Sequence, residues 1–83
     1  MFALTAHMVE RLRERCGVSS KGAARFINGL WRSGRTATEA DFVRFDSPPR
    51  RGQQYRVACN GGRDYLIILS RDGKFVTIID RDR

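Results

Sequence analysis

The chain has few of the residues on which metal sites, disulfide frameworks and membrane spans depend. Its two cysteines, Cys16 and Cys59, stand far apart and form no CxxC pair, so we expect two buried, reduced thiols and no metal site. The longest apolar run, Tyr65 to Leu69, has the length of a strand and not of a membrane-spanning helix. No secretory signal pattern precedes the cysteines. These absences predict a soluble, cytoplasmic protein that does not contact membranes.

Histidine is equally scarce, because His7 is the only one in the sequence. Any catalytic dyad, metal site or general base that requires an imidazole must therefore use this residue. The sequence has neither a P-loop nor a GxGxxG element, and none of its serines lies in a nucleophile-elbow sequence. We therefore expect neither a metal ion nor a nucleotide as cofactor.

Positive charge is what the sequence has in excess. Lysine and arginine number 16 against 9 acidic residues, which gives a net charge of +7 and a sequence pI near 10.7. Lysine occurs only at Lys21 and Lys74, so most of this charge is carried by arginine, whose planar guanidinium suits phosphate recognition. A chain of this charge attracts polyanions, and we expect RNA or another nucleic acid as its partner. Two simpler explanations are that the charge only keeps the chain soluble or that it reflects genomic base composition.

Hydrophobic periodicity predicts two helices in the first 34 residues. The first is expected over residues 6–16, with Thr5 as its N-cap and Gly17 at its end. The second is expected from residue 19 or 20 to about residue 32. The apolar stripes expected to face the core are Met8, Val9, Leu12 and Cys16 in the first helix and Ala23, Ile27, Leu30 and Trp31 in the second.

The second half of the sequence is typical of strands. Residues 36–53 are less regular, and we expect a short edge strand around Phe42, Val43 and Phe45, followed by a basic loop. Residues 54–59 alternate between apolar and polar side chains, and the Asn60-Gly61-Gly62 stretch favours a tight hairpin. The run Leu66-Ile67-Ile68-Leu69 predicts a central strand covered on both faces, and a further turn leads into a third strand that ends near residue 80.

These elements predict one α+β domain over residues 1–83. Two N-terminal helices are expected to pack on one face of an antiparallel sheet of three to four strands. The fourth strand would come from residues 1–4 or from the edge strand around residue 43. A chain of 83 residues can bury only a modest core, so we expect little tolerance of damage to it.

His7, Arg11 and Arg15 recur every four residues and form one polar row on the first helix. Such a row can hold a phosphate beside a group that transfers protons. The competing interpretation is an ordinary solvated helix face. If the sheet brings Arg56 and Thr77 near the first helix, the group becomes a concave basic cleft with one titratable base.

The remaining basic residues are expected to contact nucleic acid from loops and strand ends, although each alone could be an ordinary surface charge. They are Arg50, Arg51, Arg63 and Lys74, with Arg71 in the last turn. The carboxylates Asp80 and Asp82 lie close to the C-terminal end of the sequence, where we expect a solubilising tail.

The segment His7-Met8-Val9-Glu10-Arg11-Leu12-Arg13-Glu14-Arg15-Cys16-Gly17-Val18 resembles the H-x-x-x-R-x-x-E-R-x-G-[IV] opening of a family of small bacterial and phage proteins. That family is related to the BrnT-like toxins within the barnase, EndoU, colicin and RelE group of ribonucleases. A second helix ending near Gly34 and a last strand that carries Thr77 are similar to the family layout, whereas residues 36–51 have no matching pattern.

The resemblance implies metal-independent RNA cleavage, in which a base activates the ribose 2′-OH and cations stabilise the charge that develops on the phosphate. It implies that His7 is the general base or acid, that Arg11 and Arg15 hold phosphate, and that Thr77 orients the scissile group. A transition-state role for Arg56 follows from the strand pattern alone. An acidic antitoxin or another protein is a further possible partner.

Three hypotheses follow from the sequence. The first is a toxin-like or phage-borne metal-independent endoribonuclease. The second is a non-catalytic basic binding module, such as a phage or mobile-element accessory protein that binds nucleic acid or inhibits a nucleic-acid-binding enzyme. The third is a small assembly protein that self-associates through the apolar segment around Phe42 and Phe45. Whether the chain is an enzyme stays open at this point.

Overall fold

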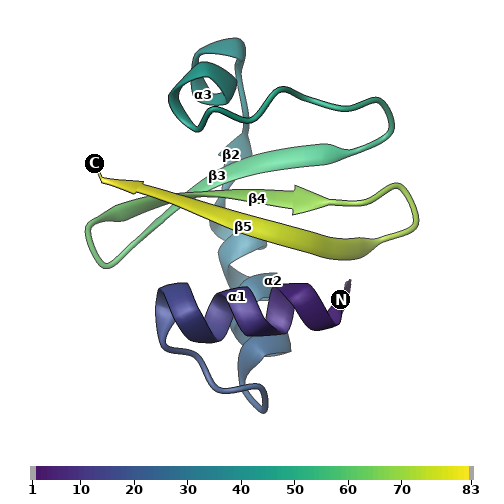
Figure 1. Cartoon of the computed structure of the whole chain (residues 1–83), viewed down its shortest axis with the longest axis vertical. Coiled ribbons are helices and arrows are strands. Elements are labelled where there is room, and N and C mark those ends of the chain that lie inside the picture. The colour runs from purple at the N-terminus through teal and green to yellow at the C-terminus, as the bar shows by residue number, and fades with distance from the viewer. Residues whose placement is uncertain (1, 83) are drawn as a thin grey trace.

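A mixed sheet separates two helices on one face from a third helix on the other (Figure 1). This computed structural model describes residues 2–82 and has an α+β fold. The five strands are ordered β1-β5-β4-β3-β2. In chain order the elements are β1 (Ala3–Leu4), α1 (Ala6–Cys16), α2 (Ala23–Ser33), β2 (Arg35–Thr36), α3 (Glu39–Arg44), β3 (Gln54–Asn60), β4 (Arg63–Leu69) and β5 (Lys74–Asp82).

Helix α1 has the predicted bounds and caps. Thr5 Oγ1 accepts a hydrogen bond from the backbone N–H of Met8, and Gly17 ends the helix with a left-handed φ of 66°. Helix α2 begins at Ala23, later than predicted, because a turn in which Gly22 N–H donates to Ser19 O precedes it. Both helices are therefore confirmed, and only the start of α2 differs.

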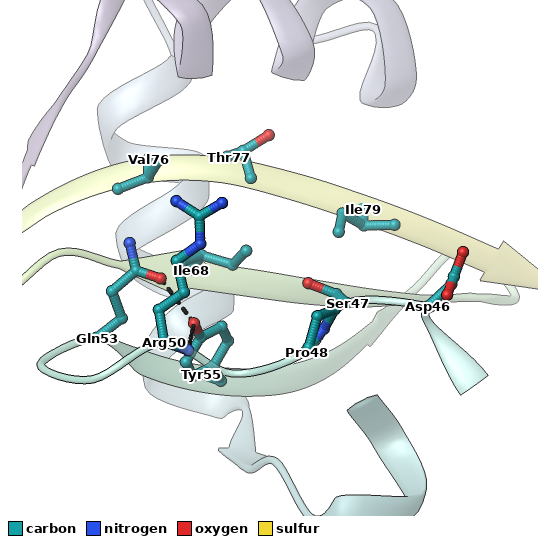
Figure 2. Close-up of a pocket in the computed structure, with 10 residues that line it drawn as sticks. All are labelled: Asp46, Ser47, Pro48, Arg50, Gln53, Tyr55, Ile68, Val76, Thr77 and Ile79. Atoms are coloured by element: carbon teal, nitrogen blue, oxygen red, sulfur yellow. Dashed lines mark hydrogen bonds between the residues drawn. The ribbon is translucent and has the colours of Figure 1, made fainter. Parts of the chain in front are cut away.

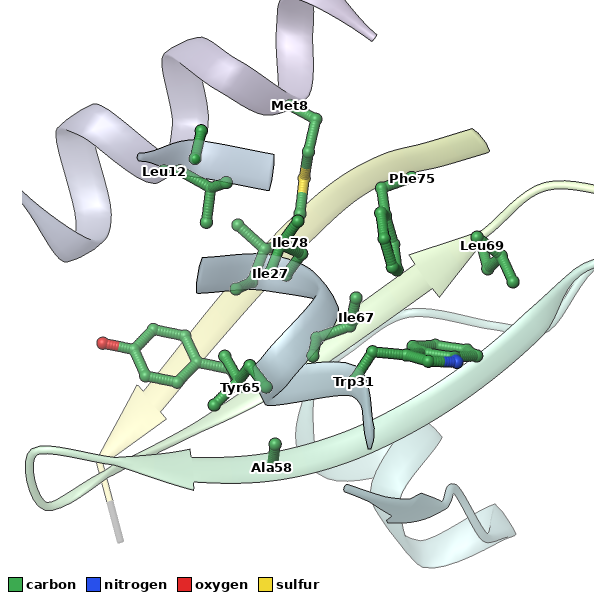
Figure 3. Packing of buried hydrophobic residues seen from close by; sticks show 12 residues of the cluster. Met8, Leu12, Ile27, Trp31, Ala58, Tyr65, Ile67, Leu69, Phe75 and Ile78 are labelled. Atoms are coloured by element: carbon green, nitrogen blue, oxygen red, sulfur yellow. The ribbon is translucent and has the colours of Figure 1, made fainter. Parts of the chain in front are cut away.

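The apolar stripes of α1 and α2 meet the sheet in one core (Figure 3). Met8 and Leu12 of α1 are fully buried, as is Ile27 of α2. Trp31 packs edge-on against Phe75 of β5, with 5.6 Å between ring centroids. Each fully buried aliphatic side chain contributes about 1.5–3 kcal/mol of transfer free energy. This packing places α1 against β5, with His7 close to that strand.

The predicted meander of β3, β4 and β5 is confirmed, including the hairpin at Gly61 and Gly62, which both have positive φ angles. Strand β4 is buried on both faces. Tyr65, Ile67 and Leu69 point into the core under α1 and α2, whereas Leu66 and Ile68 join a second cluster on the opposite face. The run of apolar residues in β4 is therefore continuous because both faces of this strand are covered, as the sequence predicted.

The expected edge strand around Phe42, Val43 and Phe45 is wrong, because residues 39–44 form helix α3. Asp41, in the first turn, accepts hydrogen bonds from the backbone N–H and the hydroxyl of Thr38 at 2.8 and 3.0 Å. Thr38 and Asp41 form a capping box, which satisfies N–H groups that a short helix otherwise leaves without a partner. Phe45 follows the helix and is buried in the second cluster.

The sheet also differs from the expected antiparallel one. Strand β1 pairs with β5 in parallel, and β2 adds a fifth strand beside β3. Met1, expected in the first strand, lies outside the described residues. Cys16 is partly buried, but the prediction of a buried thiol is wrong for Cys59, which is exposed next to the hairpin. Within residues 2–82, no helix has the length and apolar character needed to cross a membrane.

Candidate functional site

The structure brings three of the predicted site residues together where α1 lies against β5. Thr77 Oγ1 lies 3.3 Å from His7 Nε2. Arg11, one helical turn after His7, donates its Nε–H to the same nitrogen at 3.4 Å. His7 is exposed, and Arg11 and Thr77 are half-buried. A proton acceptor, a hydroxyl group and a guanidinium therefore share one accessible position.

The contact from Arg11 defines the role of His7 Nε2. A guanidinium N–H can only donate, so Nε2 is the acceptor in this arrangement and we assign the ring proton of the neutral imidazole to Nδ1. The hydroxyl of Thr77 can donate to the same lone pair or accept from a ligand. An unprotonated nitrogen on an exposed imidazole can serve as a general base when the hydroxyl of a ligand replaces one of these two contacts.

A pocket of about 320 Å³ opens next to this group on the sheet face opposite α1 and α2. Figure 2 labels ten of its lining residues, which come from the loop after α3 and from β3, β4 and β5. Ile68, Val76 and Ile79 supply apolar surface, and Thr77 lies at the edge nearest α1. The guanidinium of Arg50 extends from the loop toward β5 (Figure 2).

Tyr55 holds the loop that forms one wall of this pocket. Its hydroxyl accepts a hydrogen bond from Arg50 N–H at 2.7 Å and donates to Gln53 Oε1 at 2.6 Å. The Tyr55 ring packs edge-on against Phe42 of α3, with 5.0 Å between centroids. The loop also contains Pro48 and Pro49, which restrict its backbone. The backbone of Arg50 is therefore held in place before any ligand arrives.

Arg15 and Arg63, both predicted to contact nucleic acid, form ion pairs with carboxylates. Arg15 lies 2.6 Å and Arg63 2.7 Å from Asp80, and Arg63 also contacts Asp82 at 2.6 Å. Burial alone would raise the pKa of the Asp80 carboxyl, but the hydrogen bonds from the two guanidiniums outweigh it and lower that pKa. The expectation of a solubilising tail at Asp80 and Asp82 is wrong, because both belong to β5 and to this ion-pair cluster.

Arg56 does not join the His7 site. It lies on β3, which β4 separates from β5, and its guanidinium donates to Trp31 O at 2.9 Å. The same guanidinium stacks 4.7 Å from the centre of the Trp31 ring. These contacts make Arg56 a structural partner of the end of α2.

The other predicted cations lie at the end of the sheet where the loop before β3 meets the β4–β5 turn. A Cβ atom at Gly52 would lie 3.5 Å from Arg71 Cδ, so the two segments touch. Within residues 2–82, Arg50, Arg51 and Arg71 have no carboxylate within ion-pair distance. Lys74 is 4.0 Å from Asp72. This end of the sheet therefore carries positive charge that is not neutralised.

Of the residues that line the pocket, the predicted site included Arg50 and Thr77 but not the others. Asp46 and Ser47 lie at one end of it, and Val76 and Ile79 form part of its floor. In the sequence, only the proline-containing loop gave a local indication of the pocket. The two walls of the pocket come from segments that are far apart in the sequence, so no local pattern reveals them together.

Across the described part of the chain, no three His, Cys, Asp or Glu side chains lie close enough together to hold a metal ion. Comparison of the chain with known protein families, with curated proteins and with solved structures found no match. The resemblance to BrnT-like proteins thus stays a prediction from the His7 segment.

Proposed function

We propose that the chain is a toxin-like, metal-independent endoribonuclease that cleaves RNA at the edge of the pocket beside Thr77. The observation that carries this proposal is the convergence of Thr77 Oγ1 and Arg11 Nε on His7 Nε2. The hydroxyl comes from β5 and the other two groups come from α1, so the arrangement depends on tertiary packing and not on helix spacing alone.

In the proposed reaction His7 Nε2 accepts the proton of a ribose 2′-OH. The 2′-oxygen forms a bond to the adjacent phosphorus, and the bond from phosphorus to the 5′-oxygen breaks with its electron pair leaving on that oxygen. Solvent water protonates the 5′-oxygen, which gives a 2′,3′-cyclic phosphate and a 5′-hydroxyl end. Arg11 and Arg50 stabilise the negative charge on the phosphoryl oxygens, and Thr77 positions the imidazole.

The alternative is a non-catalytic module that only binds nucleic acid. The cluster of Arg50, Arg51 and Arg71 favours it, because counterion release at such a cluster gives affinity without chemistry. This alternative assigns no special role to His7. A substitution of His7 alone therefore distinguishes the two functions, because it should abolish RNA cleavage by a ribonuclease but leave RNA binding by a binding module unchanged.

The experiment is incubation of total RNA with the purified chain in EDTA. We expect the wild type to cleave RNA and His7→Ala to lose activity by about 100-fold or more, as expected for removal of a general base. Glu10→Ala, an exposed change on the same helix, is the matched control and should cleave as the wild type does. A folded wild type that leaves RNA intact but binds it, with His7→Ala binding equally well, would support the binding module instead.

A further inference from the structure

The pocket beside Thr77 combines an apolar floor with polar groups at its two ends. Val76 and Ile79 are only half-buried, so they expose hydrocarbon inside the pocket. The Tyr55 ring forms part of one wall, although its hydroxyl is already bonded to the loop. A phosphate group alone needs only cations, so this apolar surface points to a ligand with a flat, uncharged part.

The polar groups at the pocket ends are of opposite hydrogen-bonding type. The carboxylate of Asp46 lies at one end and has no hydrogen-bond or ion-pair partner within residues 2–82. At the other end Gln53 uses Oε1 to accept from Tyr55, which leaves its amide N–H groups to donate to a ligand. Ser47 lies beside Asp46 and can donate or accept. A nucleobase edge carries both donors and acceptors and matches such a set.

We propose that this pocket holds the base of one unpaired nucleotide, so that the substrate is single-stranded RNA. The inference rests on the proposed function, because it places the scissile phosphate next to the base, between Arg50 and His7. A volume of about 320 Å³ is at the small end of ligand pockets and suits one base, not a base pair. A base in a duplex is stacked and paired, so it would have to leave the helix to enter.

The loop that forms one wall of the pocket is restrained before a ligand binds. Tyr55 fixes the backbone of Arg50, and Pro48 and Pro49 limit the loop before ligand binding. A preformed wall lowers the entropy lost when a base enters. The pocket therefore selects single-stranded RNA by shape, and the cations at its edge bind the backbone without regard to sequence.

The first test is an NMR titration of the wild type with inorganic phosphate, ribose 5-phosphate and the four nucleoside 3′-monophosphates. At least one nucleotide should shift the backbone amide signals of Ile68, Val76 and Ile79, whereas phosphate and ribose 5-phosphate should shift only signals near Arg50 and His7. Nucleotides that shift the same signals as phosphate, with no effect on the floor, would overturn the inference.

The second test measures affinity for an RNA strand with 2′-O-methyl groups throughout, alone and annealed to its complement. Because this RNA cannot be cleaved, the result does not depend on catalysis. The single strand should bind about tenfold more tightly than the duplex, as expected for one stacked base. Ile79→Trp, which fills the pocket, should remove this preference, whereas Val43→Trp on exposed α3 should retain it. Ser47→Trp replaces Ile79→Trp if that variant does not fold.

The outcomes separate the two proposals. Equal binding of single strand and duplex, or an unchanged preference in a folded pocket-filling variant, overturns the base pocket even if the wild type cleaves RNA. A single-strand preference that depends on the pocket, in a chain that cleaves no RNA, keeps the base pocket and removes the ribonuclease proposal.

Discussion

At the scale of single residues, Thr77 brings its hydroxyl to within 3.3 Å of His7 Nε2 from the neighbouring strand. Thr77→Val removes this hydroxyl and keeps the shape of the side chain. We expect RNA cleavage to fall about two- to tenfold with an unchanged KM, because one neutral hydrogen bond contributes about 0.5–1.5 kcal/mol. Thr77→Ser keeps the hydroxyl and should cleave RNA at close to the wild-type rate. Steady-state kinetics on a short RNA would check this, and a fall for Thr77→Ser equal to that for Thr77→Val would contradict it.

Arg50 and Arg51 form a natural matched pair of residues. They are adjacent, exposed and equally charged, but Arg50 lines the pocket and Arg51 does not. Arg50→Ala should lower kcat about tenfold or more, since it removes a cation near the developing charge. Arg51→Ala should weaken RNA binding only slightly and leave kcat unchanged. Equal loss of kcat in the two variants would show that the loop contributes only non-specific charge.

At the scale of elements, α3 depends on one carboxylate. Asp41 accepts from both terminal nitrogens of Arg35 at 2.7 and 2.9 Å, in addition to its contacts with Thr38. We expect Asp41→Ala to lower the free energy of unfolding by about 1–3 kcal/mol, because it removes the cap and the ion pair together. Glu39→Ala, in the same turn, should cost less than about 1 kcal/mol. Urea denaturation would measure both, and equal losses would contradict the role given to Asp41.

The same carboxylate predicts how stability changes with pH. The hydrogen bonds from Arg35 lower the pKa of Asp41 far below its usual range, although burial opposes them. The unfolded chain then binds a proton near pH 4 that the folded chain does not, so the stabilisation is complete above about pH 5 and is lost as the pH falls. Urea denaturation should show a steeper loss between pH 5 and 3 in the wild type than in Asp41→Asn. Identical slopes would contradict this prediction.

Helix α1 and the meander could be predicted because their signals are local. The cap at Thr5, the stripe of Met8 and Leu12 and the glycines of the β3–β4 hairpin all lie within their own elements. Helix α3 has six residues and too few apolar positions to show a period, and its capping Asp41 is completed by Arg35 from outside the helix. The spacing of Thr38 and Asp41 is a local signal for a helix start, but the prediction followed the short apolar segment after it, and such a segment favours a strand.

At the scale of the whole molecule, the two ends of the sheet differ in charge. Arg15 and Arg63 are paired with Asp80 at one end, whereas Arg51 and Arg71 lie near the other end without a carboxylate within residues 2–82. Arg51→Ala or Arg71→Ala should reduce the slope of log affinity for single-stranded RNA against log salt by about 0.7. Arg15→Ala should leave the slope unchanged and lower stability instead. Equal slopes for all three variants would contradict this division of charge.

The site was predictable only in part because it is assembled by the fold. The row of His7 and Arg11 follows from helical spacing, whereas its contact with Thr77 depends on where the sheet packs against α1. The pocket could not be found, because its walls come from residues 46–55 and 68–79. The alternating pattern of β3 suggests that Arg56 is a surface residue. Its side chain lies instead on the sheet face covered by α2, where it contacts Trp31.

The most direct test of the proposed chemistry uses a DNA strand that contains a single ribonucleotide, incubated with the wild type in EDTA. The mechanism needs a 2′-OH beside the scissile phosphate, so we predict one cut, immediately after the ribonucleotide. Mass spectrometry should find a 2′,3′-cyclic phosphate on one product and a 5′-hydroxyl on the other, and His7→Ala should give no product. Cleavage at deoxynucleotides, or products with 5′-phosphate ends, would contradict a reaction in which His7 activates the 2′-OH.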